Sequence, residues 1–201
     1  MQPTTPVATP QTTRVIIPTA VPEGWVRIEG KGVAMRLPDT FKGGNMEDYA
    51  AQISARSSQE FSPGAAVMLQ EALKNPDQFA FLAFETPTGK KFLTNINIVK
   101  SRFSNERHPL DEILQATIAQ YPKDFKILES AVVKINELVV IRMVVSLKMQ
   151  TTTTKQLQYI RIDDNNDAWI TNYSTSPEEF NTWLPIFEKS YQSLELLPAA
   201  T

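Results

Sequence analysis

The longest apolar run in the chain lies between Glu137 and Met149 and reads ELVVIRMVVSLKM. Its residues alternate at the period of two that places successive side chains on opposite faces of a β-strand. One face is wholly apolar and comprises Val139, Ile141, Met143, Val145, Leu147 and Met149. The other face is mixed and comprises Leu138, Val140, Arg142, Val144, Ser146 and Lys148. This pattern predicts a central strand with a deep core on one side and partial cover on the other.

Other alternating or apolar stretches predict the strands that come earlier in the chain. Trp25–Glu29 and Val33–Leu37 form a predicted hairpin around the turn Gly30-Lys31-Gly32. Gln78–Glu85 is apolar on both faces, which indicates a buried strand, and Phe92–Lys100 is its expected hairpin partner. Between these two hairpins the pattern predicts a loop over Phe41-Lys42-Gly43-Gly44.

The central run belongs to a predicted meander of strands without a helical interruption. Its expected members are Lys126–Ile135, Leu138–Met149, Lys155–Asp163 and Ala168–Ser174. Asn136-Glu137 suits a two-residue turn between the first two of them. Because the links are short, we expect consecutive strands to be antiparallel neighbours.

Helical periodicity appears in four places. The expected helices are Met46–Ser57, Ala65–Asn75, Leu110–Tyr121 after Pro109, and a last helix that carries an aromatic stripe from Phe180 to Leu194. Ser176-Pro177-Glu178-Glu179 predicts a capping box for the last helix, and Pro185 predicts a kink or a split. We expect this helix to cover the all-apolar face of the central strand, with Leu110–Tyr121 as the alternative cover.

Composition divides the chain into three parts. Residues 1–23 are rich in Thr and Pro, which predicts a disordered linker, and residues 198–201 are expected to fray. Residues 24–197 form one expected domain. Spacers of this composition commonly separate a membrane anchor from a folded domain, so we interpret 1–23 as a tether. On that interpretation a signal segment and a lipid-bearing Cys precede Met1 in the native protein.

Charge and residue usage exclude several classes of function. The formal charge of −2 and the scattered Lys and Arg argue against a nucleic-acid binder, the only local concentration being Lys90–Lys91. The chain has no Cys, which excludes disulfides, thiolate zinc sites and thiol nucleophiles. No apolar run reaches the ~18 residues of a membrane span. A membrane is therefore expected to be reached only through the upstream anchor.

Two features carry potential chemistry, and each has a simpler explanation. His108 is the sole histidine and precedes Pro109, a place typical of a helix cap or an exposed loop. Asp163, Asn165 and Asp167 alternate as in the start of a calcium loop. However, Ala168 stands where that loop needs Gly, and Ser174 stands where it needs Glu. A polar hairpin turn explains the run better.

The remaining candidates also have structural explanations. The pairs Asp111-Glu112 and Glu178-Glu179 fall in first helical turns, where negative charge is favoured. Gly43-Gly44 lacks the spacing of a phosphate loop. We therefore assign no catalytic, cofactor-binding or metal-binding residue, expect no cofactor, and leave the partner-binding residues unassigned.

Three aromatic residues in the predicted meander allow two interpretations. Tyr159, Trp169 and Tyr173 can share one sheet face. If exposed, they would form a surface for a sugar, a peptide or a protein partner. We favour the alternative, in which helices cover them.

The order of these pieces resembles the PsbP-like superfamily, which includes the Mog-type fold and many bacterial lipoproteins of uncharacterised function. The resemblance rests on the hairpin Gly30–Asp39 with its Leu-Pro-Asp end, the aromatic strand Phe79–Glu85, the helix Leu110–Tyr121 and the aromatic helix Phe180–Tyr191, and it spans Gly24–Leu197. It implies an α+β fold in which helices flank both faces of an antiparallel sheet, an α/β/α sandwich. Members act mainly by binding other macromolecules. No functional residue is carried over.

Three hypotheses about function follow. In the first, the chain is a non-catalytic, extracytoplasmic, lipid-anchored domain that binds a protein partner or a cell-envelope component. In the second, it is an intracellular adaptor of the same fold. In the third, it is an enzyme, which would require a cleft with convergent polar groups and perturbed carboxylates.

Overall fold

The computed structural model describes residues 15–16, 22–45, 74, 78–86, 92–102, 106–148 and 153–198. The predicted helix Met46–Ser57 lies outside the described residues. Only Lys74 of the predicted helix Ala65–Asn75 is described, and it is helical. Within the predicted linker, Val15–Ile16 forms a short strand. None of the described helices is long and apolar enough to cross a membrane.

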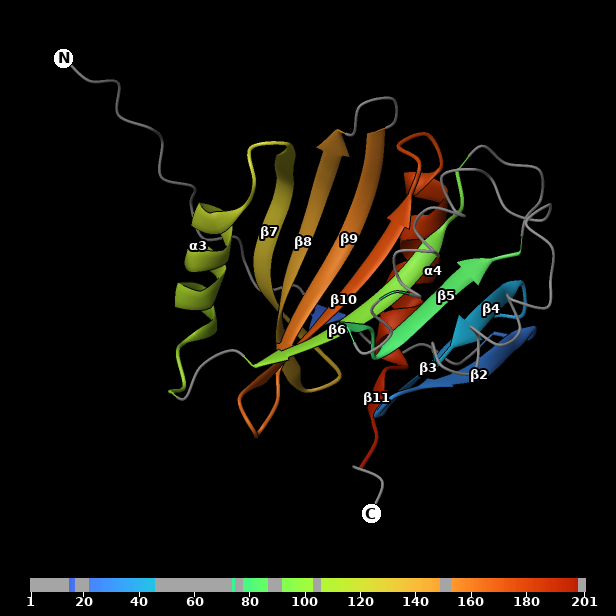
Figure 1. The fold of residues 1–201 in the computed structure, drawn as a ribbon, viewed down its shortest axis with the longest axis horizontal. Helices are drawn as coiled ribbons and strands as arrows, with labels where there is room; N and C mark the ends of the chain where they lie inside the picture. Colours follow the sequence, from blue (N-terminus) through green and yellow to red (C-terminus); the bar gives the residue numbers. More distant parts are fainter. Residues whose placement is uncertain are drawn as a thin grey trace.

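Most described strands belong to one sheet of eight, in the order β1-β7-β8-β9-β10-β6-β5-β4 (Figure 1). Its strands are β1 Val15–Ile16, β4 Phe41–Gly44, β5 Phe81–Glu85, β6 Asn95–Arg102, β7 Phe125–Ile135, β8 Leu138–Lys148, β9 Thr153–Ile162 and β10 Asp167–Thr175. Neighbours are antiparallel except β1, which runs parallel to β7.

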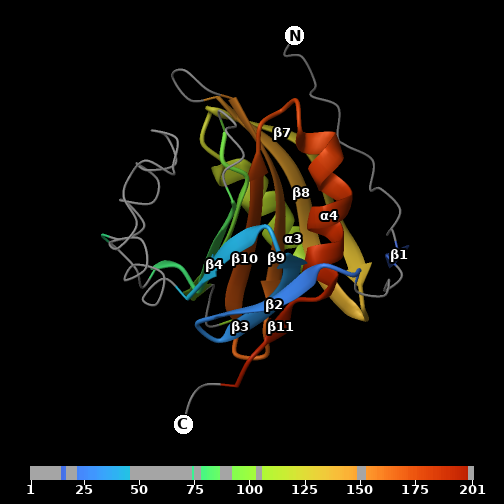
Figure 2. The same cartoon turned by 90° about the vertical axis from the view of Figure 1, so that its right-hand side faces the viewer.

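A second sheet and two helices complete the described fold. The second sheet has the order β11-β3-β2 and comprises β2 Trp25–Gly30, β3 Val33–Pro38 and β11 Glu195–Leu196. The helices are α3 Leu110–Gln120 and α4 Phe180–Gln192. Figure 2 shows α4 running along the large sheet, beside β2, β3 and β11. The fold is therefore a mostly antiparallel sheet with two described helices and a small second sheet.

The predicted meander is confirmed, since β7, β8, β9 and β10 are successive antiparallel neighbours. Each of them begins and ends within two residues of its predicted limits. Asn136 and Glu137 have φ of 48° and 67°. Two consecutive left-handed residues make the tight hairpin turn whose twist matches that of the flanking strands. β8 thus occupies an inner position between β7 and β9.

The two helices cover the opposite faces of β8 from those that the sequence predicts. Ile141, Met143 and Val145 are fully buried and cluster with Ile113 and Leu114 of α3. The prediction that α4 covers this all-apolar face is therefore wrong, and the alternative cover, Leu110–Tyr121, is correct.

Helix α4 packs instead on the mixed face of β8. There Val140 and Val144 join the cluster that contains Phe187. Arg142 on the same face bonds Glu129 of β7 at 2.9 Å and Glu188 of α4 at 3.0 Å. A charged side chain such as Arg142 can lie beneath a helix when it forms ion pairs there. The sequence pattern therefore did not reveal which face of β8 lies under α4.

The predicted loop over Phe41–Gly44 is wrong, because these residues form β4 and pair with β5. Phe41 is 1% exposed and packs edge-on against Trp183 of α4. Gly43 has φ of +142°, and a Cβ there would lie 2.2 Å from the Leu82 carbonyl oxygen. The glycines therefore serve close strand packing rather than a flexible turn.

Two other predicted details need correction. The predicted strand Gln78–Glu85 begins only at Phe81, and the Ala80 carbonyl just before it accepts a hydrogen bond from Lys31 N–H in the β2–β3 turn. The helix α4 begins at Phe180, although the Ser176 Oγ still accepts from Glu179 N–H at 3.4 Å. It then runs through Pro185 without a break. Pro185 and Asn181 are exposed, so water can satisfy the Asn181 carbonyl that lacks its usual donor.

Candidate functional site

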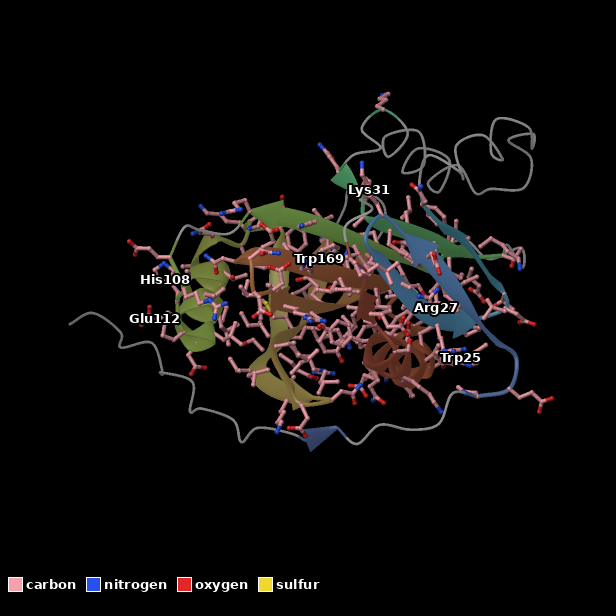
Figure 3. The ribbon with its side chains drawn as sticks, turned by 90° about the horizontal axis from the view of Figure 1, so that it is seen from below. Trp25, Arg27, Lys31, His108, Glu112 and Trp169 are labelled. Atoms are coloured by element: carbon pink, nitrogen blue, oxygen red, sulfur yellow. The ribbon has the colours of Figure 1, made fainter. Side chains whose placement is uncertain are left out.

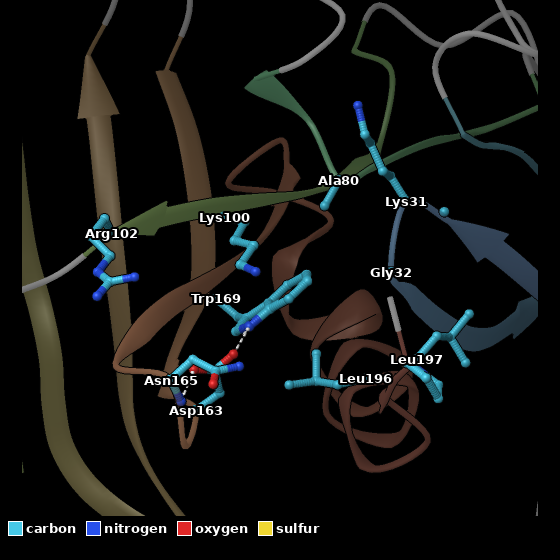
Figure 4. A pocket seen from close by; sticks show the side chains of 12 residues that line it. Lys31, Gly32, Ala80, Lys100, Arg102, Asp163, Asn165, Trp169, Leu196 and Leu197 are labelled. Carbon is cyan, nitrogen blue, oxygen red and sulfur yellow. Dashed lines mark hydrogen bonds between the residues drawn. The ribbon is translucent and has the colours of Figure 1, made fainter. Parts of the chain in front are cut away.

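A cleft of about 1000 Å³ lies where the β2–β3 turn and β11 approach β6 and the β9–β10 turn. Figure 4 shows the side chains that line it. They are Gly30, Lys31, Gly32, Ala80, Lys100, Arg102, Asp163, Asn165, Trp169, Leu196, Leu197 and Pro198. A concave site of this size with an apolar wall and a few polar groups is the usual form of a ligand site.

The β9–β10 turn builds one wall of the cleft around a single carboxylate. The Asp163 Oδ1 accepts hydrogen bonds from Asn165 N–H at 2.9 Å and Asp167 N–H at 3.0 Å. Its Oδ2 accepts from Trp169 Nε1 at 2.9 Å, the bond drawn in Figure 4. Asp163 therefore fixes both the hairpin turn and the orientation of the Trp169 ring.

Trp169 forms the link between the cleft and the core. Its side chain lines the cleft, yet it is 5% exposed and belongs to the main apolar cluster. Gly32 has φ of +72° and lies so close that an added Cβ would be 3.5 Å from the ring. The β2–β3 turn thus packs directly on Trp169, and Gly32 serves its left-handed φ while Gly30 allows the backbone to approach the Ala80 carbonyl.

Strand pairing places two cations beside Trp169. In the β10–β6 register Trp169 is opposite Lys100, and Asp167 is opposite Arg102. The Lys100 Nζ lies 5.0 Å from the ring centroid of Trp169 and 2.9 Å from Asp167 Oδ2. The Arg102 Nη1 lies 3.8 Å from Asp167 Oδ1, beyond hydrogen-bond distance. The rim of the cleft therefore has two cations that share one carboxylate.

The Asp163 carboxyl has a lowered pKa. Burial alone would raise this pKa, but the hydrogen bonds from Trp169, Asp167 and Asn165 outweigh burial, with help from the Lys100 charge. A general base or acid that works near neutral pH needs a carboxyl pKa raised toward 7. The direction of the shift therefore marks Asp163 as a structural carboxylate.

We expect Asp163→Asn to lower the free energy of unfolding at pH 7 by about 1–2 kcal/mol, because it weakens three hydrogen bonds to a charged acceptor. A lowered folded-state pKa stabilises above the ordinary value of 3.8, and that stabilisation is lost as the pH falls through the folded pKa. The difference between the two proteins should therefore shrink below pH 3.8 in urea unfolding experiments.

The control for this prediction is Asp164→Asn in the same turn. The Asp164 side chain is fully exposed, and its carboxylate lies 3.5 Å from Arg107 at the surface. Such a pair contributes little, so this variant should unfold like the wild type at every pH. Equal losses in both variants would contradict the role given to Asp163.

The favoured interpretation, in which helices cover the aromatic residues, is confirmed for Tyr159 and Tyr173 but not for Trp169, which is buried yet lines the cleft. Tyr159 and Tyr173 are 0% exposed and meet edge-on, at 6.4 Å between centroids. Tyr191 of α4 stacks on Tyr159 at 3.8 Å, and burial raises the pKa of both Tyr173 and Tyr191. These rings are core, and Trp169 alone of the three predicted aromatics reaches the cleft.

The other sequence candidates lie away from the cleft or serve the fold. His108 is exposed near Glu112 and does not line the cleft, and Figure 3 shows both residues at α3. Asp111 and Glu112 lie in the first turn of α3 as predicted, whereas Glu178 and Glu179 precede α4. Among the described residues, no group of three or more His, Asp and Glu could hold a metal ion.

The Asp163–Asp167 run forms the predicted hairpin turn rather than a calcium loop. Asp163 N–H donates to the Asp167 carbonyl at 3.0 Å, and Asn166 takes the left-handed φ of 62°. All three bonds to the Asp163 carboxylate are internal to this hairpin.

The cleft itself was missed by the sequence analysis. The structure gathers Lys31, Lys100 and Arg102 although their positions in the chain look scattered, and the predicted cluster Lys90–Lys91 lies outside the described residues. One signal was available. On one face of β6, Ile96 and Ile98 are followed by Lys100 and Arg102, which indicates a strand that leaves the core and reaches an open rim.

Comparison with known proteins identifies the class of fold. No protein-family model and no curated protein matches the chain. Solved structures do match, and they show a PsbP-like fold.

Two of the similar structures cover nearly the whole chain. One is the cyanobacterial PsbP, CyanoP, from Synechocystis sp. PCC 6803, with 8% identity, a TM-score of 0.52, and coverage of 90% of this chain and 97% of that one. The other is LpqN, described as involved in cell envelope biogenesis of Mycobacterium tuberculosis, with 12% identity, a TM-score of 0.52, and coverage of 87% and 91%. At these identities the likeness shows the fold alone.

Proposed function

We propose that this chain is a non-catalytic binding domain that recognises a protein partner or a cell-envelope component through the Trp169 cleft. The observation that carries the proposal is the cleft itself, which combines an apolar wall at Leu196 and Leu197 with cations at its rim. Asp163, the carboxylate in its wall, is committed to hydrogen bonds that hold the cleft in shape. This chemistry suits recognition more than proton transfer.

The proposal includes an organisation and a location. Residues 24–197 form an α/β/α sandwich of the superfamily that includes the Mog-type fold, residues 1–23 tether it, and residues 198–201 are a short tail. The domain acts outside the cytoplasm as a bacterial lipoprotein. The Thr/Pro-rich composition of 1–23 supports the tether, and the involvement of LpqN in cell envelope biogenesis supports the location by analogy of fold.

A variant that fills the cleft tests the proposal. Asn165 lines the cleft, is exposed and lies in the β9–β10 turn, so Asn165→Trp should block the cleft without disturbing the core. We expect this variant to lose the partner that the wild type captures from the envelope fraction of the source cells. Capture is measured by cross-linking and quantitative mass spectrometry.

The matched control is Asp164→Trp, which adds the same ring to the same turn at a fully exposed side chain that does not line the cleft. It should capture the partner as the wild type does. Equal capture by all three proteins would show that recognition lies elsewhere on the domain.

A further inference from the structure

We infer that the ligand of the Trp169 cleft is an extended peptide segment that bears a carboxylate next to an apolar side chain. This inference rests on the proposed function and adds the chemistry of the ligand. Three features carry it: the charge of the rim, the apolar wall, and the edge of β11 on which no described strand lies.

The charge of the rim favours an anion. Lys100 and Arg102 line the cleft, and both lie next to Asp167. Lys100 and Arg102 share the single carboxylate Asp167, whereas the Asp163 carboxylate accepts three hydrogen bonds from its own hairpin. The Arg102 side chain is 66% exposed, and its guanidinium can bind a second carboxylate in the two-pronged manner of arginine.

The opposite wall favours an apolar side chain. Leu196 and Leu197 are partly buried and face the same cleft as Trp169 and Ala80. Figure 4 shows the two leucines across the cleft from Asp163 and Trp169. A ligand with an apolar group beside its anionic group can use both walls at once.

The edge of the small sheet favours a peptide over a lipid. β11 pairs with β3 on one side, and no described strand lies on its other side. Leu197 N–H donates to the Gly32 carbonyl at 2.9 Å, so Leu196, one residue earlier, directs its backbone N–H and C=O away from β3. Leu196 lines the cleft, so this edge offers backbone hydrogen bonds to an extended chain. A lipid headgroup would not form the strand-like hydrogen bonds that the Leu196 N–H and C=O offer.

The test uses the full chain and two pools of fluorescein-labelled hexapeptide amides. Both pools mix Leu, Ile, Val and Thr at five positions, and the fixed position is Glu in one pool and Gln in the other. Fluorescence anisotropy should show tighter binding of the Glu pool by the wild type. Arg102→Gln, which removes the exposed cation without adding repulsion, should weaken binding of the Glu pool about tenfold and abolish the preference.

The control variant is Arg107→Gln, because Arg107 is exposed and paired with Asp164 outside the cleft. It should keep the preference for Glu. Equal binding of the two pools by the wild type would overturn the inference. Arg102-dependent binding of phosphatidylglycerol vesicles without a preference for Glu would assign the site to lipid instead. The peptide assay and the capture experiment can fail separately. If the peptide inference failed but Asn165→Trp still lost its envelope partner, only the ligand class would be wrong. If Asn165→Trp also captured the partner as the wild type does, the proposed function would fail.

Discussion

Val145→Asp is expected to prevent folding. Val145 is 0% exposed in the centre of β8, between Ile127 on β7 and Gln156 on β9. Its side chain packs in the cluster beneath α3, with Ile113 and Leu114. A carboxylate at this position would lose its hydration with no cation in the cluster to pair with it, at a cost of several kcal/mol. That cost is comparable with the whole stability of a typical domain, about 5–15 kcal/mol.

Lys148→Asp is the matched control, because it introduces the same side chain three residues further along the same strand. Lys148 is exposed at the end of β8, where the new carboxylate would stay hydrated. We expect a change within about 0.5 kcal/mol. Far-UV circular dichroism and urea unfolding would separate the two variants. If both variants folded equally well, β8 could not be the inner strand of the sheet.

The strand meander could be predicted because its signals are local. Each of its strands has nine or more residues, and the turn at Asn136-Glu137 is short enough to force an antiparallel pair. The buried face of α4 could also be predicted, because Phe180, Trp183, Phe187 and Tyr191 recur at helical spacing. All four side chains are buried in the structure.

The cover of each face could not be predicted, because it depends on partners far apart in the chain. Arg142 looks like a mark of an open face, yet Glu129 and Glu188 satisfy it beneath α4. The apolar face of β8 gives no sign of which helix it meets, because both candidate helices have apolar stripes. On this face Ile141, Met143 and Val145 are fully buried, whereas Val139 near the start of β8 is 50% exposed.

The cleft depends on the same kind of long-range pairing. Lys100 reaches Trp169 only because β6 lies beside β10, and no local pattern specifies that register. The Gly32 turn reaches Trp169 because the β2–β3 hairpin joins a separate sheet with β11. Sequence reasoning found β6, β10, the β2–β3 hairpin and the turn at Asp163, but it did not find β11. The site exists only after these distant parts of the chain pack together.

Gly43→Ala is expected to lower the free energy of unfolding by about 3 kcal/mol or more. A Cβ at this position would lie 2.2 Å from the Leu82 carbonyl oxygen and 2.6 Å from the Ala83 Cα, and both atoms belong to the backbone of β5. A flexible side chain could move aside, but β5 is fixed by β6 on its other edge. The φ of +142° adds strain for any residue with a Cβ. We therefore expect β4 to separate from β5.

Gly24→Ala separates the contribution of packing from that of backbone conformation. Gly24 also has a positive φ, +78°, but an added Cβ would meet nothing within 4 Å. Its expected loss is only the backbone strain, about 1–2 kcal/mol. Urea unfolding gives both losses, and amide hydrogen exchange in β5 should rise in Gly43→Ala alone. Equal losses would mean that Gly43 is needed only for its φ, as in a loop, and that β4 does not pack against β5 as the structure places it.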